Sequence, residues 1–242
     1  MTLRGPGTYL PTREKKLKAL QCYLAIIEYL LPTDQTILSS CLWHSDLHVE
    51  NIFVDPKNLT EVVGIIDWQS TELAPLFNQA RQPYFLDYDG PRVRGLERPR
   101  LPENLAQLDQ AAKTRAEALY LNMSLSALYK TFLHMHNPRL YRAMEFQETG
   151  SFELLLLARN LVVDGEATYL AQVVEVEKTW AELPGVRVHG NALYPFNFSE
   201  EEKSEIEADV TGALRGIQAM RGVQKGLGEL FPEKGPCEVG GL

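Results

Sequence analysis

The sequence predicts an α+β protein that is mostly helical and contains one small β-hairpin. Two apolar runs rich in β-branched residues, at positions 52–54 and 62–66, flank the turn-rich link DPKNLTE. The stretches outside this region repeat apolar residues at three- and four-residue spacing, which is typical of amphipathic helices. With 242 residues, of which 45% are hydrophobic, the chain is long enough to bury a core.

The first predicted element is a helix over residues 12–31. Its leucine and isoleucine side chains repeat at three- and four-residue spacing, at Leu17, Leu20, Leu24, Ile27 and Leu31. Pro32 ends the pattern. The basic residues of the amino terminus resemble a transit peptide faintly, and the stronger interpretation is that they open this helix. A short apolar strand over residues 41–43 follows.

After the hairpin the chain is predicted to be irregular and then helical. Residues 68–102 contain many prolines and little regular patterning, and connections of this length are usually functional or disordered. Helices are predicted over residues 105–136, 151–163, 166–183 and 199–222. Apolar side chains that share a helix face are Leu108, Ala112, Leu119, Leu125, Leu128 and Phe132, and later Ile206, Val210, Leu214 and Ile217. Ser199 and Glu202 have the spacing of a capping box.

The domain is expected to span residues 1–230, because residues 231–242 are rich in glycine and proline and are predicted to fray.

Composition excludes several classes of protein. The formal net charge is −8, and an acidic surface repels nucleic-acid backbones. The three cysteines form no CxxC pair, so a disulfide framework is not expected. No apolar run reaches the roughly 18 residues of a membrane span.

The polar stretch HSDLHVEN, at residues 44–51, is the strongest functional signal. Asp46 and Asn51 stand at D-x-x-x-x-N spacing, and Asp67 ends the second hairpin strand in GIIDW. Because a hairpin returns its second strand to the start of the first, we expect Asp67 beside Asn51. Amide and carboxylate oxygens suit Mg²⁺. Asp46 is placed to accept a proton from a hydroxyl group, so the set contains the parts that phosphoryl transfer requires.

Together, HSDLHVENIFVD and GIIDW resemble the aminoglycoside-phosphotransferase and choline-kinase branch of the protein-kinase-like fold. The resemblance implies that Asp46 is the catalytic base and that His44 is the structural histidine bracing its loop. It implies that Asn51 and Asp67 are the Mg²⁺ ligands. His48 corresponds to the second histidine of this branch. The resemblance implies that it is one of the cofactor-binding residues, in a supporting rather than a catalytic role. The hairpin is thus expected to carry the metal site.

The surrounding sequence resembles a fungal subgroup of this family more closely. The segments GPGTYLPTREKKLKALQCYL, LLPTD, LWHSDLHVENIFVDP and IIDWQSTELAPLF are similar to fungal phosphotransferase-family proteins related to the altered-inheritance-of-mitochondria group. The similarity is dense from Gly5 to Pro91. It implies ATP and Mg²⁺ as cofactors and a small-molecule hydroxyl as the acceptor. It also implies a mitochondrial location, with the cytoplasm as the alternative.

The family places an amino-terminal lobe, with a phosphate-covering loop and a strand lysine, before this region. Only 43 residues precede His44, and they are predicted to form mainly one helix. The chain is therefore expected to be the carboxy-terminal lobe alone. Two hypotheses follow: ATP- and Mg²⁺-dependent transfer of a phosphoryl group to a small-molecule hydroxyl, or a non-catalytic binding module. The second would bind a partner chain, or dimerise, through the face where the other lobe docks.

The same residues also allow simpler interpretations. His44 and His48 stand at the spacing of a zinc pair, but that spacing matters on a helix and these residues lie in a loop. Asp46 and Asn51 each suit a turn taken singly, although together with Asp67 they form a pattern that turns do not explain. In LDYDG, residues 86–90, the two aspartates suit either a cationic substrate or a turn, and the following proline favours the turn.

Overall fold

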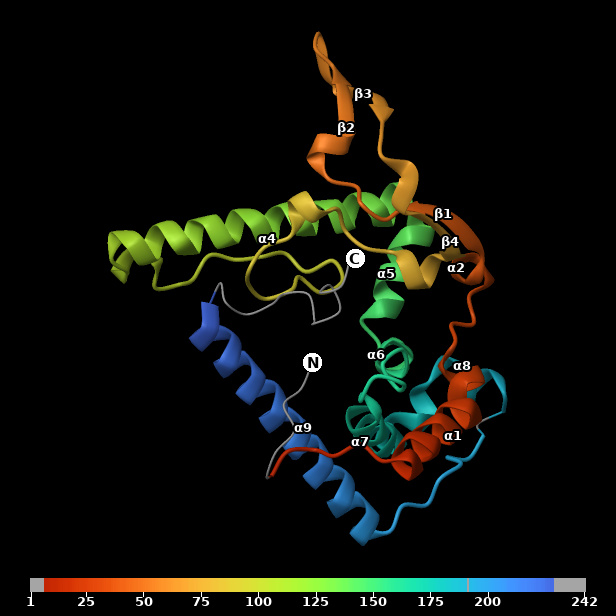
Figure 1. Ribbon diagram of the computed structural model, residues 1–242. Coiled ribbons are helices and arrows are strands. Elements are labelled where there is room, and N and C mark those ends of the chain that lie inside the picture. Colours follow the sequence, from red (N-terminus) through yellow and green to blue (C-terminus); the bar gives the residue numbers. More distant parts are fainter. Residues whose placement is uncertain (1–6, 191, 229–242) are drawn as a thin grey trace, which may run out of the picture. The chain divides into compact units, whose positions relative to one another are not determined.

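The computed structural model describes residues 7–190 and 192–228 (Figure 1). The chain divides into two compact units. One joins Met1–Leu31 with Gly150–Leu242, and the other is formed by Pro32–Thr149. Helices dominate and the strands form small antiparallel sheets, which confirms the predicted α+β class.

The described residues of the first unit form helices joined by loops and contain no strand. Its helices are α1 (Arg13–Leu30), α6 (Gly150–Ala158), α7 (Glu166–Val176), α8 (Pro184–Val188) and α9 (Glu200–Leu227), with a 3₁₀ segment at Glu177–Glu182. Side chains from several of these helices form one core, which includes Ile26, Leu30, Leu154, Tyr169, Val173 and Val186. Burying each apolar side chain of this size contributes about 1.5–3 kcal/mol, so this core stabilises the unit.

Helix α1 is confirmed, but the face that it buries is not the face of the leucine repeat from which the helix was predicted. Leu17, Leu20 and Leu24 are exposed. The buried residues are Ala19, Cys22, Ile26 and Leu30. Small side chains in this stripe let α1 lie close to α7, where the rings of Tyr23 and Tyr169 meet edge to face at 6.3 Å. Hydrophobicity alone does not separate two overlapping apolar stripes, whereas side-chain size decides which one packs.

Helix α9 begins with the predicted capping box. The Ser199 hydroxyl oxygen accepts the Glu202 backbone N–H at 3.2 Å, and the Glu202 carboxylate accepts the Ser199 backbone N–H at 2.9 Å. The buried residues of this helix are Ile206, Gly212, Gly216 and Met220. Leu214 and Ile217, predicted on the buried face, are exposed. Gly212 lies at the contact instead, where the backbone of Thr8 and Tyr9 approaches closely.

Gly212 and Gly222 give a matched test of that close approach. A Cβ atom at Gly212 would lie 2.8 Å from the backbone nitrogen of Tyr9, whereas Gly222 has open space around it. We expect Gly212→Ala to lower the free energy of unfolding by about 1–3 kcal/mol through overpacking. We expect Gly222→Ala to raise it by about 0.5–1 kcal/mol, because alanine favours the helix. Urea denaturation measures both, and equal effects would contradict the close approach.

The second unit carries all the strands of the described residues. Its elements are α2 (Gln35–Leu38), β1 (Ser40–His44), β2 (Ile52–Asp55), β3 (Asn58–Ile65), β4 (Thr71–Pro75), α3 (Leu76–Gln79), α4 (Gln110–His136) and α5 (Pro138–Gln147). Short 3₁₀ turns occur at Val49–Asn51, Trp68–Ser70, Tyr84–Leu86 and Leu105–Gln107. The predicted strand and hairpin are confirmed as β1 and as β2 with β3. Strand β4 and helix α5 were not predicted.

The strands form two separate antiparallel pairs. Strand β1 pairs with β4, where His44 lies opposite Thr71. Strand β2 pairs with β3, where Ile52 lies opposite Ile65. Strand β4 reads TELAP and lacks regular alternation, so it was included in a segment predicted to be irregular. Its pairing with β1, rather than its own residue pattern, makes it a strand.

Helix α4 also buries a face that its apolar pattern did not predict. Leu125, Leu128 and Phe132 are exposed, whereas Ser126 and Lys130 are buried. The polar residues are buried because the segment after α3 crosses this side of the helix. Ser126 donates a hydrogen bond to the Gln82 side chain at 3.0 Å, and Lys130 donates to the Val93 carbonyl oxygen at 2.6 Å. These bonds satisfy groups whose burial would otherwise be costly.

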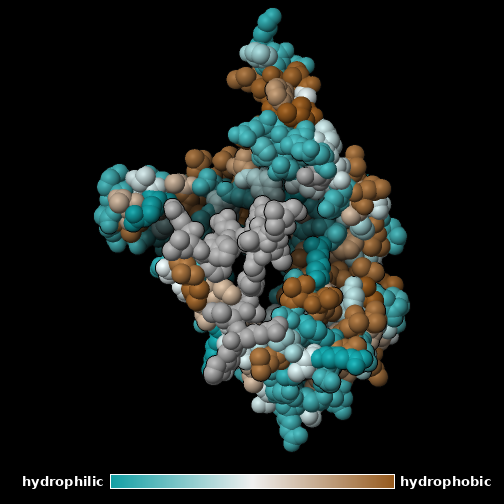
Figure 2. Space-filling view, viewed as in Figure 1, coloured by the Kyte–Doolittle hydropathy of each residue, from teal (hydrophilic) through white to brown (hydrophobic). Residues whose placement is uncertain are grey.

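The β2–β3 hairpin presents apolar side chains to solvent, visible at the top of Figure 2. The exposed residues are Phe53, Val54, Leu59, Val62, Val63, Ile65 and Ile66. An isolated two-stranded hairpin is marginally stable in water, and a gathering of exposed apolar residues is typical of an interaction surface.

Two further expectations concern the extent of the chain and the membrane. Residues 231–242, predicted to fray, lie outside the described residues, and the single domain over residues 1–230 stays a prediction. Within the part of the chain that the structure describes, no helix combines the length and the hydropathy that crossing a membrane requires.

Candidate active site

The candidate site lies where the two strand pairs meet. Residues 45–51 connect β1 to β2, and residues 66–70 connect β3 to β4. The pairs His44–Thr71 and Ile52–Ile65 hold the two ends of both connections side by side. The two loops therefore face each other, as expected from the sequence, and the structure adds the β1–β4 pair that clamps their outer ends (Figure 1).

Asn51 is the residue that joins the two loops. It is buried, with 5% of its surface exposed. Its side-chain Nδ2 donates to the carbonyl oxygen of Asp46 at 2.9 Å, and its own carbonyl oxygen accepts the backbone N–H of Ile66 at 3.0 Å. Asn51 thus closes the loop that carries Asp46 and holds the residue that precedes Asp67. The predicted proximity of Asn51 and Asp67 follows directly from these bonds.

Asp67 adopts the left-handed backbone conformation, with φ of 63° and ψ of 53°. This conformation is uncommon for residues other than glycine, although aspartate tolerates it better than most. Such residues cost of order 1–3 kcal/mol and cluster at functional sites. The conformation lets the chain turn from β3 into the 3₁₀ turn at Trp68–Ser70, and the Asp67 side chain lies exposed at that turn.

His44 braces the two loops from the end of β1. Its Nε2 donates to the carbonyl oxygen of Ile66 at 2.8 Å, because a carbonyl oxygen only accepts. Its ring meets the Trp68 ring edge to face, with centroids 4.8 Å apart. The buried Nδ1 has no hydrogen-bond partner among the described residues. His44 therefore contacts the residues on both sides of Asp67.

Asp46 and His48 line the exposed side of the first loop. Half of the Asp46 side chain is exposed, and its Oδ2 lies 3.7 Å from Nε2 of His48. The same His48 nitrogen lies 3.2 Å from the Asn51 amide nitrogen, which is a donor. In the neutral ring Nε2 is therefore the acceptor, and the proton lies on Nδ1, 3.9 Å from Glu50. The Asp46 carboxylate stays accessible to a hydroxyl group.

The oxygen atoms of Asn51 and Asp67 suit Mg²⁺. Because Asn51 uses its Nδ2 as a donor to Asp46, its Oδ1 remains as the group that can bind a cation. An amide oxygen with a carboxylate is a donor set for a hard cation, and Mg²⁺ completes its shell with water and phosphate oxygens. Among the described residues there is no group of three or more His, Cys, Asp and Glu side chains that could hold a metal ion.

Sequence reasoning missed Arg81, which follows α3. One of its guanidinium nitrogens donates to the carbonyl oxygen of Ser45, directly before Asp46. The other donates to the Tyr84 hydroxyl at 3.3 Å, and the guanidinium lies 5.4 Å from the centre of that ring. The only signal in the sequence was the irregular segment itself, because an arginine in such a segment matches no motif.

Comparison with known proteins finds a family match over part of the chain. The family model described as the phosphotransferase enzyme family matches residues 6–79, a segment that contains both loops of the candidate site. The resemblance inferred from the sequence is therefore confirmed over this segment.

The individual relatives are fungal. A subtelomeric hrmA-associated cluster protein of Aspergillus fumigatus is 25% identical over 69% of this chain and 32% of its own length. Altered inheritance of mitochondria protein 9, mitochondrial, of Lachancea thermotolerans is 20% identical over 75% of this chain and 29% of its own length. The protein of the same name from Saccharomyces cerevisiae is 23% identical over 71% and 27%. The chain spans about a third of the length of these curated relatives. No solved structure gives a significant match.

Proposed function

We propose that this chain carries the active-site loops of an ATP- and Mg²⁺-dependent phosphotransferase that acts on a hydroxyl group of a small molecule. The observation that carries the proposal is the pair of bonds made by Asn51, one to Asp46 and one to the residue before Asp67. These bonds hold close together the backbone of the three residues to which the proposal assigns phosphoryl transfer. The match of residues 6–79 to the phosphotransferase enzyme family supports it.

In this proposal Asp46 is the catalytic base. Its exposed carboxylate accepts the proton of the acceptor hydroxyl as the hydroxyl oxygen forms a bond to the γ-phosphorus of ATP. The bond between that phosphorus and the bridging oxygen breaks, and ADP leaves with the electron pair. Asp46 later releases the proton to water. Little covalent chemistry falls to the protein, so the rate depends on how well Asp46 is positioned.

Asn51 and Asp67 are the proposed Mg²⁺ ligands. The ion, when bound, neutralises charge on the phosphate oxygens of the nucleotide. His44 is a positioning residue, because its bond to the Ile66 carbonyl oxygen and its contact with Trp68 hold the turn that presents Asp67. His48 accepts from the Asn51 amide and thereby orients that amide oxygen.

The proposal extends to the fold and the location. We take residues 1–230 as the carboxy-terminal lobe of a protein-kinase-like fold, with the hairpin carrying the metal site. The residues that cover the nucleotide are then supplied by a separate lobe, in keeping with relatives more than twice as long as this chain. Two relatives carry the word mitochondrial in their names, which supports a mitochondrial location for this chain.

A thermal-shift titration with Mg-ATP tests this proposal. A ligand at 100 times its Kd stabilises the folded state by about 2.7 kcal/mol, so binding raises the unfolding temperature. We expect the shift in the wild-type chain to require Mg²⁺ and to be lost in Asp67→Asn. Glu61→Gln is the matched control, because it removes an exposed carboxylate from the same hairpin without touching the site.

The outcome also separates the two functions that the sequence left open. A Mg²⁺-independent shift, or one equal in Asp67→Asn and Glu61→Gln, would contradict the assigned metal ligands. The absence of any shift would favour a non-catalytic module that binds a partner chain or a second copy. The observation that favours this second function is the exposed apolar surface of the β2–β3 hairpin (Figure 2).

A further inference from the structure

We propose that a pocket beside the candidate loop is the acceptor site, and that it selects small hydroxyl compounds bearing a carboxylate or phosphate group. This inference rests on the proposed function for the reaction, whereas the binding that it describes is testable by itself. The pocket lies within the second unit and has a volume of about 500 Å³. Ligand pockets commonly measure about 300–1,000 Å³, so a metabolite of modest size fits.

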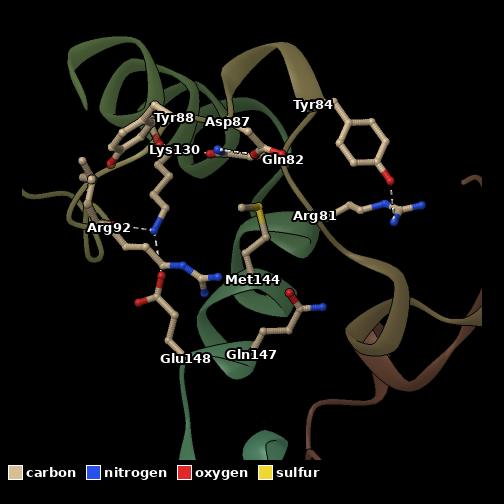
Figure 3. A pocket seen from close by; sticks show the side chains of 13 residues that line it. Arg81, Gln82, Tyr84, Asp87, Tyr88, Arg92, Lys130, Met144, Gln147 and Glu148 are labelled. Carbon is tan, nitrogen blue, oxygen red and sulfur yellow. Dashed lines mark hydrogen bonds and ion pairs between the residues drawn. The ribbon is translucent and has the colours of Figure 1, made fainter. Parts of the chain in front are cut away.

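Three segments form the walls of the pocket (Figure 3). The irregular segment after α3 supplies eight residues between Arg81 and Val93, α4 supplies Ser126 and Lys130, and α5 and its end supply Met144, Gln147 and Glu148. Figure 3 shows Arg81 and Arg92 on opposite sides of the pocket, with Met144 and Gln147 between them. The segment that was predicted to be irregular therefore forms one wall of this pocket.

The acidic side chains of the pocket already have partners. Glu148 accepts a hydrogen bond from the buried Lys130 ammonium group at 2.7 Å. Asp87 accepts from the Gln82 amide at 3.0 Å. Neither carboxylate is left to attract a cation alone, and Asp89 does not line the pocket. A cationic acceptor, which the two aspartates of LDYDG first suggested, is therefore not favoured.

One cation of the pocket has no partner among the described residues. Arg92 is exposed and makes no hydrogen bond or ion pair there, whereas Lys130 and Arg81 both do. The lining carries Arg81, Arg92 and Lys130 against Asp87 and Glu148, which leaves it with an excess of positive charge. A guanidinium group pairs with carboxylate and phosphate through two parallel hydrogen bonds. Arg92 is thus the group that recognises an oxyanion.

Arg81 connects the pocket to the proposed chemistry. It lines the pocket and donates to the carbonyl oxygen of Ser45, the residue before Asp46. A molecule anchored in the pocket therefore lies next to the loop that holds the proposed base. Anchoring the anionic end at Arg92 leaves the hydroxyl end of the molecule to be presented to Asp46, which is the positioning that phosphoryl transfer requires.

Isothermal titration without ATP or Mg²⁺ tests the inference with four related probes. Glycerate carries a carboxylate and glycerol 3-phosphate carries a phosphate, whereas glycerol is neutral and choline is a cation. We expect one or both anionic probes to bind and the other two not to bind. Arg92→Gln should weaken binding of the anion by about 10- to 100-fold, the scale of a charge-assisted hydrogen bond. Which anion binds more tightly identifies the oxyanion.

Arg94→Gln is the matched control, because Arg94 is exposed on the same segment and does not line the pocket. We expect it to bind the anions as the wild type does. Equal affinities in Arg92→Gln and Arg94→Gln, binding of choline in place of the anions, or no binding of either anion would overturn the inference. Thermal unfolding without ligand checks that Arg92→Gln is folded, and Arg92→Lys replaces it if it is not.

The same titration on Asp67→Asn separates this inference from the proposed function. Anion binding should persist in this variant, because Asp67 does not line the pocket. Anion binding without any Mg-ATP shift in the wild type would leave the pocket assigned and would remove the phosphotransferase proposal. A Mg-ATP shift without anion binding would support the phosphotransferase proposal and would remove the assignment of the pocket.

Discussion

Asp46→Asn is expected to lower the rate of phosphoryl transfer by about 10²–10⁴-fold, the scale of a general base, in the form of the protein that transfers phosphate. The substitution keeps the size of the side chain and removes its ability to take up a proton. The Asp46 contact to Asn51 uses the backbone carbonyl oxygen, so the loop should keep its conformation. Steady-state kinetics should therefore show a lower kcat with little change in the KM for ATP.

Glu50→Gln provides the control for this experiment. Glu50 lies in the same loop, its side chain is 86% exposed, and its carboxylate lies 3.9 Å from Nδ1 of His48. Removing its charge should change the rate by less than about threefold, which is the spread expected for an exposed charge. A comparable loss in both variants would mean that loop charge, rather than proton transfer at Asp46, controls the rate.

Lys16→Met is expected to lower the free energy of unfolding by about 3 kcal/mol, at the low end of the range for breaking a buried ion pair. The Lys16 ammonium group lies 3.0 Å from the carboxylates of both Asp164 and Glu166. Glu166 is fully buried, and its other partner is the Tyr9 hydroxyl at 2.9 Å. Burial, followed by the hydrogen bond to Glu166, raises the pKa of Tyr9, so that hydroxyl remains a donor.

The size of this effect comes from Glu166, because its fully buried carboxylate would lose its cationic partner. The matched control is Lys178→Met, because Lys178 and Glu175 form an ion pair in which both side chains are largely exposed. Exposed pairs contribute about 0–1 kcal/mol, so this variant should unfold almost as the wild type does. Urea denaturation measures both. If the two variants lose the same stability, Glu166 is not an uncompensated buried charge in Lys16→Met.

Much of the candidate site could be predicted from local sequence. The spacing of Asp46 and Asn51, and the position of Asp67 at the end of a strand, depend only on a hairpin that returns to its start. Hairpin geometry is local, so the proximity of Asn51 and Asp67 was predicted correctly from 24 consecutive residues, 44–67. The capping box of α9 was predicted for the same reason, because both of its hydrogen bonds join residues three apart.

The errors concern contacts between residues far apart in the chain. Strand β4 exists because it pairs with β1, about 30 residues earlier, and its own sequence gives no alternation. The buried face of α1 depends on which stripe fits α7, some 150 residues later. Arg81 became part of the site through a bond to Ser45, across 36 residues. Residue patterns report the hydrophobicity of a face and do not report what packs against it.

The sequence alone determined the α+β class, the hairpin, the loop residues His44, Asp46 and Asn51, and the resemblance to the phosphotransferase family. These features depend on short-range geometry and on residue chemistry, and residues that are close together in the chain determine both. Only the tertiary structure decided that an irregular segment folds against α4 and α5 to form a pocket, and that Arg92 has no partner among the residues that the structure describes. Such a result requires knowing which charges already neutralise one another, and that depends on distances between residues that the order of the chain does not contain.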